Sequence, residues 1–251
     1  MSSTKAENVP KISKKIVKPM NPTEFDPNNV VYSTVKANNE IKTRWIDTTY
    51  KRETGDNRIF ITARGCVIKS YKKVEMKDKD KKVVDDGKKR KDKYQIFMSL
   101  QDESFIEMIK QYESAIMDTS VKRSKEWHDE IYNREDTQGL FNSIMSEHPK
   151  YGYAIGGILS RDFTCKSKTD EVPDVSDLEV ALAKNNVVDV CFWFNKIKLN
   201  LDKSKIGLEI THINIVGKTE GVSSEALCMK PEDYEPGKIT LTKVETNKEG
   251  A

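Results

Sequence analysis

The segment from Asn186 to Gly217, NVVDVCFWFNKIKLNLDKSKIGLEITHINIVG, carries the densest alternating apolar pattern in the chain. Large apolar residues occupy every second position from Val188 to Phe194. After Asn195 and Lys196 the alternation resumes on the other parity, at Ile197 and the two leucines that follow. Side chains of a strand alternate between the two faces of a sheet, so a change of parity indicates a bulge or a strongly bent strand.

The second half of this segment changes parity in the same way. Ile206 and Ile210 share one parity, whereas Ile213 and Ile215 take the other. Two strands that face each other across a short turn and both change parity predict a curled sheet. The fold class that we predict is mainly β (α+β), an OB-like curled β-barrel with a helical insertion and a long basic hairpin loop. A two-layer sandwich is the alternative.

The chain of 251 residues is long enough for one elaborated domain with its own core. Its formal net charge of +3 is too small to indicate nucleic acid by itself, so the distribution of charge has to decide. Four cysteines, Cys66, Cys165, Cys191 and Cys228, lie far apart in the sequence. We interpret them as reduced thiols of an intracellular protein, located in the host cytoplasm or nucleus if the protein is viral.

The pattern divides the chain into three parts. Residues 1–28 are polar and lysine-rich, and predict a flexible basic tail that is either simply solvated or settles on phosphates. Residues 29–245 form the single OB-like domain, with a helical insertion at 102–148 that Asp102 caps. The apolar spacing of Leu140, Phe141, Ile144 and Met145 predicts a last short helix there. Residues 246–251 are predicted to be frayed.

The most charged segment, Lys72 to Lys93, reads KKVEMKDKDKKVVDDGKKRKDK and has no period that would bury a face. It lies between two strand patterns, which makes it the tip of a long hairpin. Two interpretations stay open: a solvated loop that keeps the protein soluble, and a finger that lies along a polyanion.

The sequence contains none of the common catalytic motifs. HExxH, GxSxG and Walker-type patterns are all missing, and the three histidines are far apart. We therefore expect no catalytic residues, no metal and no cofactor. No apolar run reaches about 18 residues, the length of a membrane-spanning helix, so we expect no membrane partner.

Aromatic residues are interleaved with Lys and Arg on the predicted strands. Single-strand binding without sequence preference combines positive charge for phosphates with flat side chains that stack on bases. The candidate nucleic-acid-binding residues are Arg44, Trp45, Tyr50, Lys51, Arg52, Lys69, Tyr71, Lys72, Lys73, Lys88, Lys89, Arg90, Lys91, Tyr94, Trp193, Lys196 and Lys198. The alternative for each aromatic residue is a half-buried strand position that packs on a neighbour.

The hairpin pattern of residues 186–217, with Lys205-Ile206-Gly207-Leu208-Glu209 after its turn, resembles the closing hairpin of single-stranded-DNA-binding OB-fold proteins of large eukaryotic DNA viruses. The resemblance implies a barrel with inserted helices that binds single strands through strand faces and loops. It covers about 30 residues closely. The end of the chain, KVETNKEGA, departs from the acidic tail of many such proteins.

These observations favour a non-enzymatic protein that binds single-stranded DNA without sequence preference, during DNA replication, recombination or repair, in a viral setting. The expected partner is single-stranded nucleic acid, with DNA favoured over RNA, and self-association along the strand is a further expectation. The competing hypothesis is a structural or interaction protein, a virion component or adaptor, that binds protein partners through a sheet edge.

Overall fold

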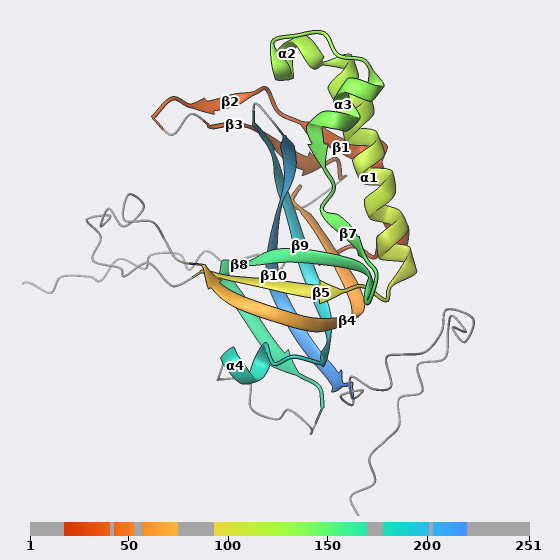
Figure 1. The fold of residues 1–251 in the computed structure, drawn as a ribbon, viewed down its shortest axis with the longest axis vertical. Helices are drawn as coiled ribbons and strands as arrows, with labels where there is room; N and C mark the ends of the chain where they lie inside the picture. The colour runs from red at the N-terminus through yellow and green to blue at the C-terminus, as the bar shows by residue number, and fades with distance from the viewer. Residues whose placement is uncertain are drawn as a thin grey trace, which may run out of the picture.

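The computed structural model describes residues 18–40, 43–52, 57–74, 93–169, 178–200 and 203–219. Five strands form a barrel (Figure 1): β4 (Ile59–Val74), β5 (Lys93–Ser99), β8 (Gly152–Ser167), β9 (Asn186–Leu199) and β10 (Ser204–Lys218). They pair in the order β9-β4-β5-β8-β10, and β10 pairs with β9 to close the ring. Only the β8–β10 pair of this ring is parallel. This mainly β, OB-like barrel confirms the predicted fold class.

The two changes of parity in the closing hairpin are β-bulges. Lys196 pairs with Gly207 and Phe194 with Leu208, so Asn195 is an extra residue on β9. A second shift of register follows Ile210 on β10. Residues Phe192 and Phe194 before the first bulge are fully buried, and so is Ile197 after it. The predicted change of parity is therefore confirmed, and it lets one strand bury both of its ends in the same core.

Short strands extend the barrel sheet on either side. β1 (Val30–Tyr32) and β2 (Lys36–Asn38) pair with β3 (Thr43–Tyr50), which pairs with the second half of β9. β6 (Phe141–Asn142) pairs with β10, and β7 (Met145–His148) pairs with β8. The β4–β5 hairpin is present as predicted, and its tip, residues 75–92, lies outside the described residues.

The helical insertion consists of α1 (Glu103–Lys122), α2 (Ser124–His128) and α3 (Arg134–Leu140). Asp102 caps α1, as predicted, by accepting a hydrogen bond of 3.1 Å from the Phe105 amide. The apolar face of α1 packs on the barrel: the Phe105 ring stacks on Phe192, with 5.3 Å between ring centroids. The short helix α4 (Leu178–Ala181) precedes β9.

The predicted last helix of the insertion is wrong. Residues Phe141–Asn142 and Met145–His148 are strands that pair with β10 and β8. The apolar spacing of this segment suits a helix, but the free edges of β8 and β10 offer hydrogen bonds that a single turn of helix would not replace.

The N-terminal part of the chain packs earlier than the predicted boundary at residue 28. Two short 3-10 helices, η1 (Pro22–Glu24) and η2 (Pro27–Asn29), place Phe25 in the core. The Met20 amide donates to the Phe60 carbonyl at 2.8 Å, and Met20 is 9% exposed. Residues 1–17 and 246–251 lie outside the described residues, so the prediction for them stays a prediction.

The described cysteines, Cys66, Cys165 and Cys191, carry free thiols, and burial raises the pKa of each of them. Cys228 lies outside the described residues. In the described part of the chain, none of the helices has the length and apolar character that a bilayer crossing requires.

Gly157 on β8 should be intolerant of even a methyl group. A Cβ atom there would lie 2.8 Å from both Cγ1 and Cδ1 of Ile210, and 3.6 Å from Cε1 of Phe192. We predict that Gly157→Ala lowers the free energy of unfolding by about 1–3 kcal/mol, the usual cost of overpacking a core. Urea denaturation measures the change.

Gly156 provides the matched control, because a Cβ atom there meets its nearest neighbour, Nε2 of Gln95, at an ordinary 3.6 Å. Gly156→Ala should leave the unfolding midpoint nearly unchanged. Equal destabilisation by the two substitutions would contradict the packing argument.

Candidate nucleic-acid interface

A groove with a volume of about 1120 Å³ runs over the outer side of the barrel. Its floor and walls come from β5, β8, β9 and β10, together with the segment between β6 and β7. The outer faces of strands such as β5 and β8, the second and third strands of the barrel in chain order, are where OB folds bind oligonucleotides. The groove is therefore the first place to look for a binding site.

Positive charge dominates this groove. Its cationic residues come from three strands of the barrel and a bulge in a fourth, and they are Lys93, Arg161, Lys196, Lys198 and Lys205. Among the described residues that line the groove, Glu209 is the single carboxylate. The Asn195 side-chain amide donates to the Glu209 carboxylate at 2.9 Å. We name the five cationic residues the groove cations.

The groove cations are close enough to act on one another. Burial lowers the pKa of Lys198, and repulsion from Lys196, Lys205 and Lys93 lowers it further, whereas Glu209 opposes the shift. A group of like charges on a partly desolvated surface is a cost to the folded protein. A bound polyanion would remove that cost, because each phosphate replaces repulsion by attraction.

Bulges direct the cations outward. Without the extra residue Asn195, the alternation set by Phe192 and Phe194 would turn Lys196 and Lys198 toward the core. On β8, residues 160–163 stand opposite a single β10 residue, because Leu159 pairs with Ile210 and the next pair is Thr164 with His212. This loop-like bulge brings Arg161 to the rim of the groove.

Flat and apolar side chains lie among the cations. Tyr94 and Phe163 are half-buried, pack against the core and line the groove, and Ile158 is 38% exposed. These surfaces are suited to base stacking, which contributes about 1–3 kcal/mol per base in single-strand binding. The groove therefore combines the two features that this kind of binding requires.

One wall of the groove is held by α1. Ser143 and Ile144 line the groove, and both bond to the carboxylate of Glu113 on α1, Ile144 through its amide at 2.7 Å. Burial raises the pKa of Glu113, although these two hydrogen bonds lower it. Glu113 thus fixes the position of Ser143 and Ile144, which form part of the groove wall, relative to α1.

The sheet register aligns the predicted Trp45 with the groove. Lys36, Trp45, Lys198 and Lys205 are direct neighbours across β2, β3, β9 and β10. Direct cross-strand neighbours share one face of a sheet. Of the predicted residues, Tyr94, Lys196 and Lys198 line the groove, and Trp45 lies beside Lys198 without lining it.

Trp193 lies on the outer face of β9, as its parity predicted, but it is already engaged. Its ring stacks on that of Phe60, its partner on β4, with 5.9 Å between centroids. The guanidinium of Arg58 lies over both rings, 5.1 Å from the Phe60 centroid and 5.9 Å from that of Trp193. Trp193 is half-buried in this cluster and is absent from the residues that line the groove.

Two predicted aromatic residues pack inward. Tyr50 is 6% exposed, its ring lies 5.5 Å from that of Phe25, and its hydroxyl accepts from the Asp26 amide at 2.9 Å. Tyr50 therefore cannot stack on a base, and its prediction as a binding residue is wrong. Tyr71 is half-buried and packs against the core.

Five predicted cations near Trp45, Tyr50 and Tyr71 lie outside the groove, and the two arginines among them make contacts within the protein. Arg44 pairs with Asp129 at 2.5 Å, which ties β3 to the end of α2, and Arg52 lies 5.9 Å from the Tyr50 ring centroid. Lys51 is exposed, and so are Lys72 and Lys73. The structure places none of these five cations in the groove.

The remaining predicted cations lie elsewhere. Lys69 contacts Tyr151 at the far end of β8, outside the groove. Lys88, Lys89, Arg90 and Lys91 lie outside the described residues.

Three groove residues were not predicted from the sequence: Arg161, Lys205 and Phe163. None of them sits in an obvious cluster of basic and aromatic residues along the chain. The pattern SRDFT could have drawn attention as a polar interruption of the β8 strand pattern, the usual signal of a bulge.

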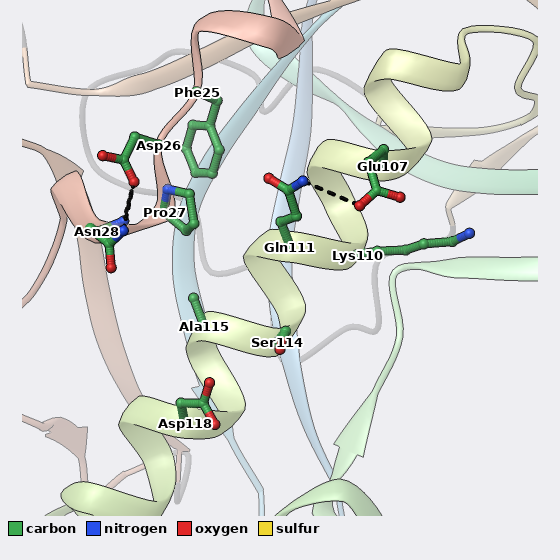
Figure 2. Close-up of a pocket in the computed structure, with 10 residues that line it drawn as sticks. All are labelled: Phe25, Asp26, Pro27, Asn28, Glu107, Lys110, Gln111, Ser114, Ala115 and Asp118. Carbon is green, nitrogen blue, oxygen red and sulfur yellow. Dashed lines mark hydrogen bonds between the residues drawn. The ribbon is translucent and has the colours of Figure 1, made fainter.

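A smaller depression of about 720 Å³ lies between η2 and α1 (Figure 2). Three carboxylates line it, those of Asp26, Glu107 and Asp118, against one cation, Lys110. Asp26 caps η2 and Asp118 pairs with Arg134, so both carboxylates have structural roles. This charge does not suit a polyanion. In the described part of the chain, no three His, Cys, Asp or Glu residues gather in a way that could hold a metal ion.

No protein-family model matches this chain, and no curated protein matches it. Solved structures with a similar arrangement include the single-stranded DNA-binding protein from bacteriophage Enc34 in complex with ssDNA. That structure has a TM-score of 0.41 and 11% identity, and the match covers 76% of this chain and 98% of that chain. A second structure of the Enc34 protein has a TM-score of 0.39 and 11% identity, covering 81% and 98%.

The single-stranded DNA-binding protein encoded by bacteriophage T7 has a TM-score of 0.41 and 9% identity, covering 72% of this chain and 100% of that chain. These three likenesses are weak, so the fold assignment rests on the strand order described above. All three structures come from bacteriophage proteins, and the predicted resemblance to proteins of large eukaryotic DNA viruses stays a prediction.

Trp193 should contribute to stability through its contact with Phe60. We predict that Trp193→Ala lowers the free energy of unfolding by about 2 kcal/mol, roughly half the cost of truncating a fully buried aromatic residue. Trp193→Phe keeps a flat ring against Phe60 and should recover most of that loss. Urea denaturation followed by circular dichroism compares the variants. An unchanged midpoint for Trp193→Ala would show that the ring contributes nothing to packing.

Proposed function

We propose that this protein is a non-enzymatic single-stranded DNA-binding protein that binds without sequence preference in the groove of the barrel. Its role would be to protect or organise single strands during DNA replication, recombination or repair, in a viral setting. The observation that carries the proposal is the groove itself, with five cations against one carboxylate and half-buried aromatic rings on the outer face of an OB-like barrel.

The interleaving of charge and flat surface favours a single strand over a duplex. A duplex presents its phosphates and hides its base faces, so a groove with only lysines would serve it. Here Tyr94 and Phe163 line the same groove as the cations, and Trp45 is the cross-strand neighbour of Lys198. Exposed base faces, which only a single strand offers, would use these rings.

The hairpin tip adds to this proposal. The chain leaves β4 at Val74 and returns at Lys93, which is one of the groove cations and the direct partner of Val74. The described residues on either side of segment 75–92 are therefore paired at the rim of the groove. We propose that Lys88, Lys89, Arg90 and Lys91 in this segment contribute further phosphate contacts.

The competing hypothesis, a protein partner added to a sheet edge, has less to support it. The described strand order ends at β1 and β6, which have three and two residues. Edges this short offer few unpaired backbone groups to a partner strand. Salt separates the two hypotheses, because phosphate binding weakens steeply as salt is added and an apolar edge contact does not.

The first test measures the anisotropy of labelled oligothymidylate of about 16 nucleotides, the upper end of OB-fold site sizes, over a range of salt. Each neutralised phosphate contributes about −0.7 to the slope of log K against log salt. The triple variant Lys196→Gln, Lys198→Gln and Lys205→Gln should therefore bind more weakly, with a slope shallower by about 2. Unlabelled duplex and an RNA of equal length serve as competitors.

Wild-type protein that fails to bind at low salt would overturn the proposed function. Binding that duplex displaces as well as single strand does would overturn the preference for single strands. Circular dichroism of the triple variant checks that its fold is kept, which we expect because all three side chains point out of the core.

A second prediction uses Gly156, which lines the groove and has room for a side chain. Gly156→Glu would place a negative charge among the cations and should weaken binding roughly tenfold, the effect of a repulsion of ~1.4 kcal/mol. Gly139→Glu on α3 makes the same change at an open position away from the groove. If both variants bind DNA equally well, the bound DNA strand does not pass over Gly156.

A further inference from the structure

A second basic cluster lies at the other end of β8, around Tyr151 in the turn between β7 and β8. The Lys69 ammonium lies 4.9 Å from the centroid of the Tyr151 ring, and that of Lys150 lies 5.7 Å from it. The His148 ring stacks on the same ring, with 4.6 Å between centroids and 19° between planes. We name Lys69, Lys150 and Lys184, with this ring pair, the turn cluster.

The turn is rigidly built. The Tyr151 amide donates to the His148 carbonyl at 3.1 Å, and the Lys150 amide donates to Nδ1 of the His148 ring, also at 3.1 Å. The backbone thus fixes the His148 ring, and the stacked Tyr151 ring supports Lys69 and Lys150. This places positive charge at a defined position on the surface.

Among the described residues, the charges that act on the Lys69 amine are positive. Burial lowers the pKa of Lys69, and repulsion from Lys184 and Lys150 lowers it further, so the neighbouring charges that act on this amine are both positive. Lys69 comes from β4, Lys150 from the turn and Lys184 from the segment after α4. Three separate elements bring cations to one place, where an anion would relieve their repulsion.

One row of described residues without charge lies between the turn cluster and the groove cations. Ser70 pairs with Phe97, and Phe97 pairs with Gly156, so these three residues form one row across β4, β5 and β8. The next row contains the exposed Lys72 with Gln95 and Ile158, and the last two residues line the groove. Phe97 is half-buried on this outer face. A DNA strand could cross here with its flat, uncharged bases over this row and its phosphates held at both ends.

We propose that the turn cluster is a second phosphate-binding site for the same DNA strand, which leaves the groove at Gly156, crosses Phe97, and ends at Lys69, Lys150 and Lys184. The inference rests on the proposed function, because the groove has to bind the strand first. Gly152 and Ile158 are six residues apart on β8, about 20 Å at the rise of a strand. Only DNA strands long enough to span that distance would reach both the groove and the turn cluster.

The dependence of affinity on oligonucleotide length tests this proposal. Labelled oligothymidylates of about 4, 8, 12 and 16 nucleotides cover the range of OB-fold site sizes. The variant Lys150→Gln with Lys184→Gln removes two exposed cations of the turn cluster and leaves Lys69 in place. Lys122→Gln with Lys125→Gln makes the same charge change at exposed positions on α1 and α2.

The turn-cluster variant should bind the shortest oligonucleotide as the wild type does. It should bind the longest one more weakly, with a slope against log salt shallower by about 1.4. The control variant should follow the wild type at every length. Equal loss of affinity at all lengths, or no loss at any, would overturn this inference and leave the proposed function standing. Wild-type protein that binds at no length would overturn both.

Discussion

The bulge at Asn195 is the constraint on which both the barrel and its groove depend. A Cβ atom on Gly207 would lie 2.6 Å from Oδ1 of Asn195 and 2.9 Å from Cγ of Lys196, so only glycine allows the two strands to approach this closely. The Asn195 amide also bonds across the strands to Glu209. The extra residue changes which side of β9 faces the core, so the same strand buries Phe194 and still exposes Lys196.

The bulges explain how a chain with little net charge presents a strongly basic surface. The chain has 43 basic and 40 acidic residues, so no large excess of positive charge exists to be shared. The fold creates the surface locally by pairing Lys198 with Lys205 across β9 and β10. Like charges placed directly opposite are unfavourable in a sheet. A bound DNA strand would supply the negative charge that this pair of lysines lacks.

The closing hairpin, its changes of parity, the cap at Asp102 and the β4–β5 hairpin could all be predicted from the sequence. Each of them depends on neighbours within a few residues, or on the two-residue period of a strand. The Tyr50 prediction failed because a strand tyrosine beside basic residues looks the same whether its ring faces solvent or packs on Phe25. The helix predicted around Phe141 and Met145 was wrong because β6 pairs with the distant strand β10, and β7 pairs with β8 across a short turn that the apolar spacing does not reveal.

The groove itself depends on register, which explains why only part of it could be predicted. Lys196 and Lys198 were predicted because they lie close to Trp193 in a strand pattern, whereas Lys205 and Arg161 become neighbours only when β10 pairs with β9 and β8. The same register produces the uncharged row of Ser70, Phe97 and Gly156 between two groups of cations. A flexible polyanion with flat, uncharged bases matches that alternation of charged, flat and charged surface. A folded protein partner would have to present the same alternation from a fixed backbone, and the short edges at β1 and β6 give it no strand to build on.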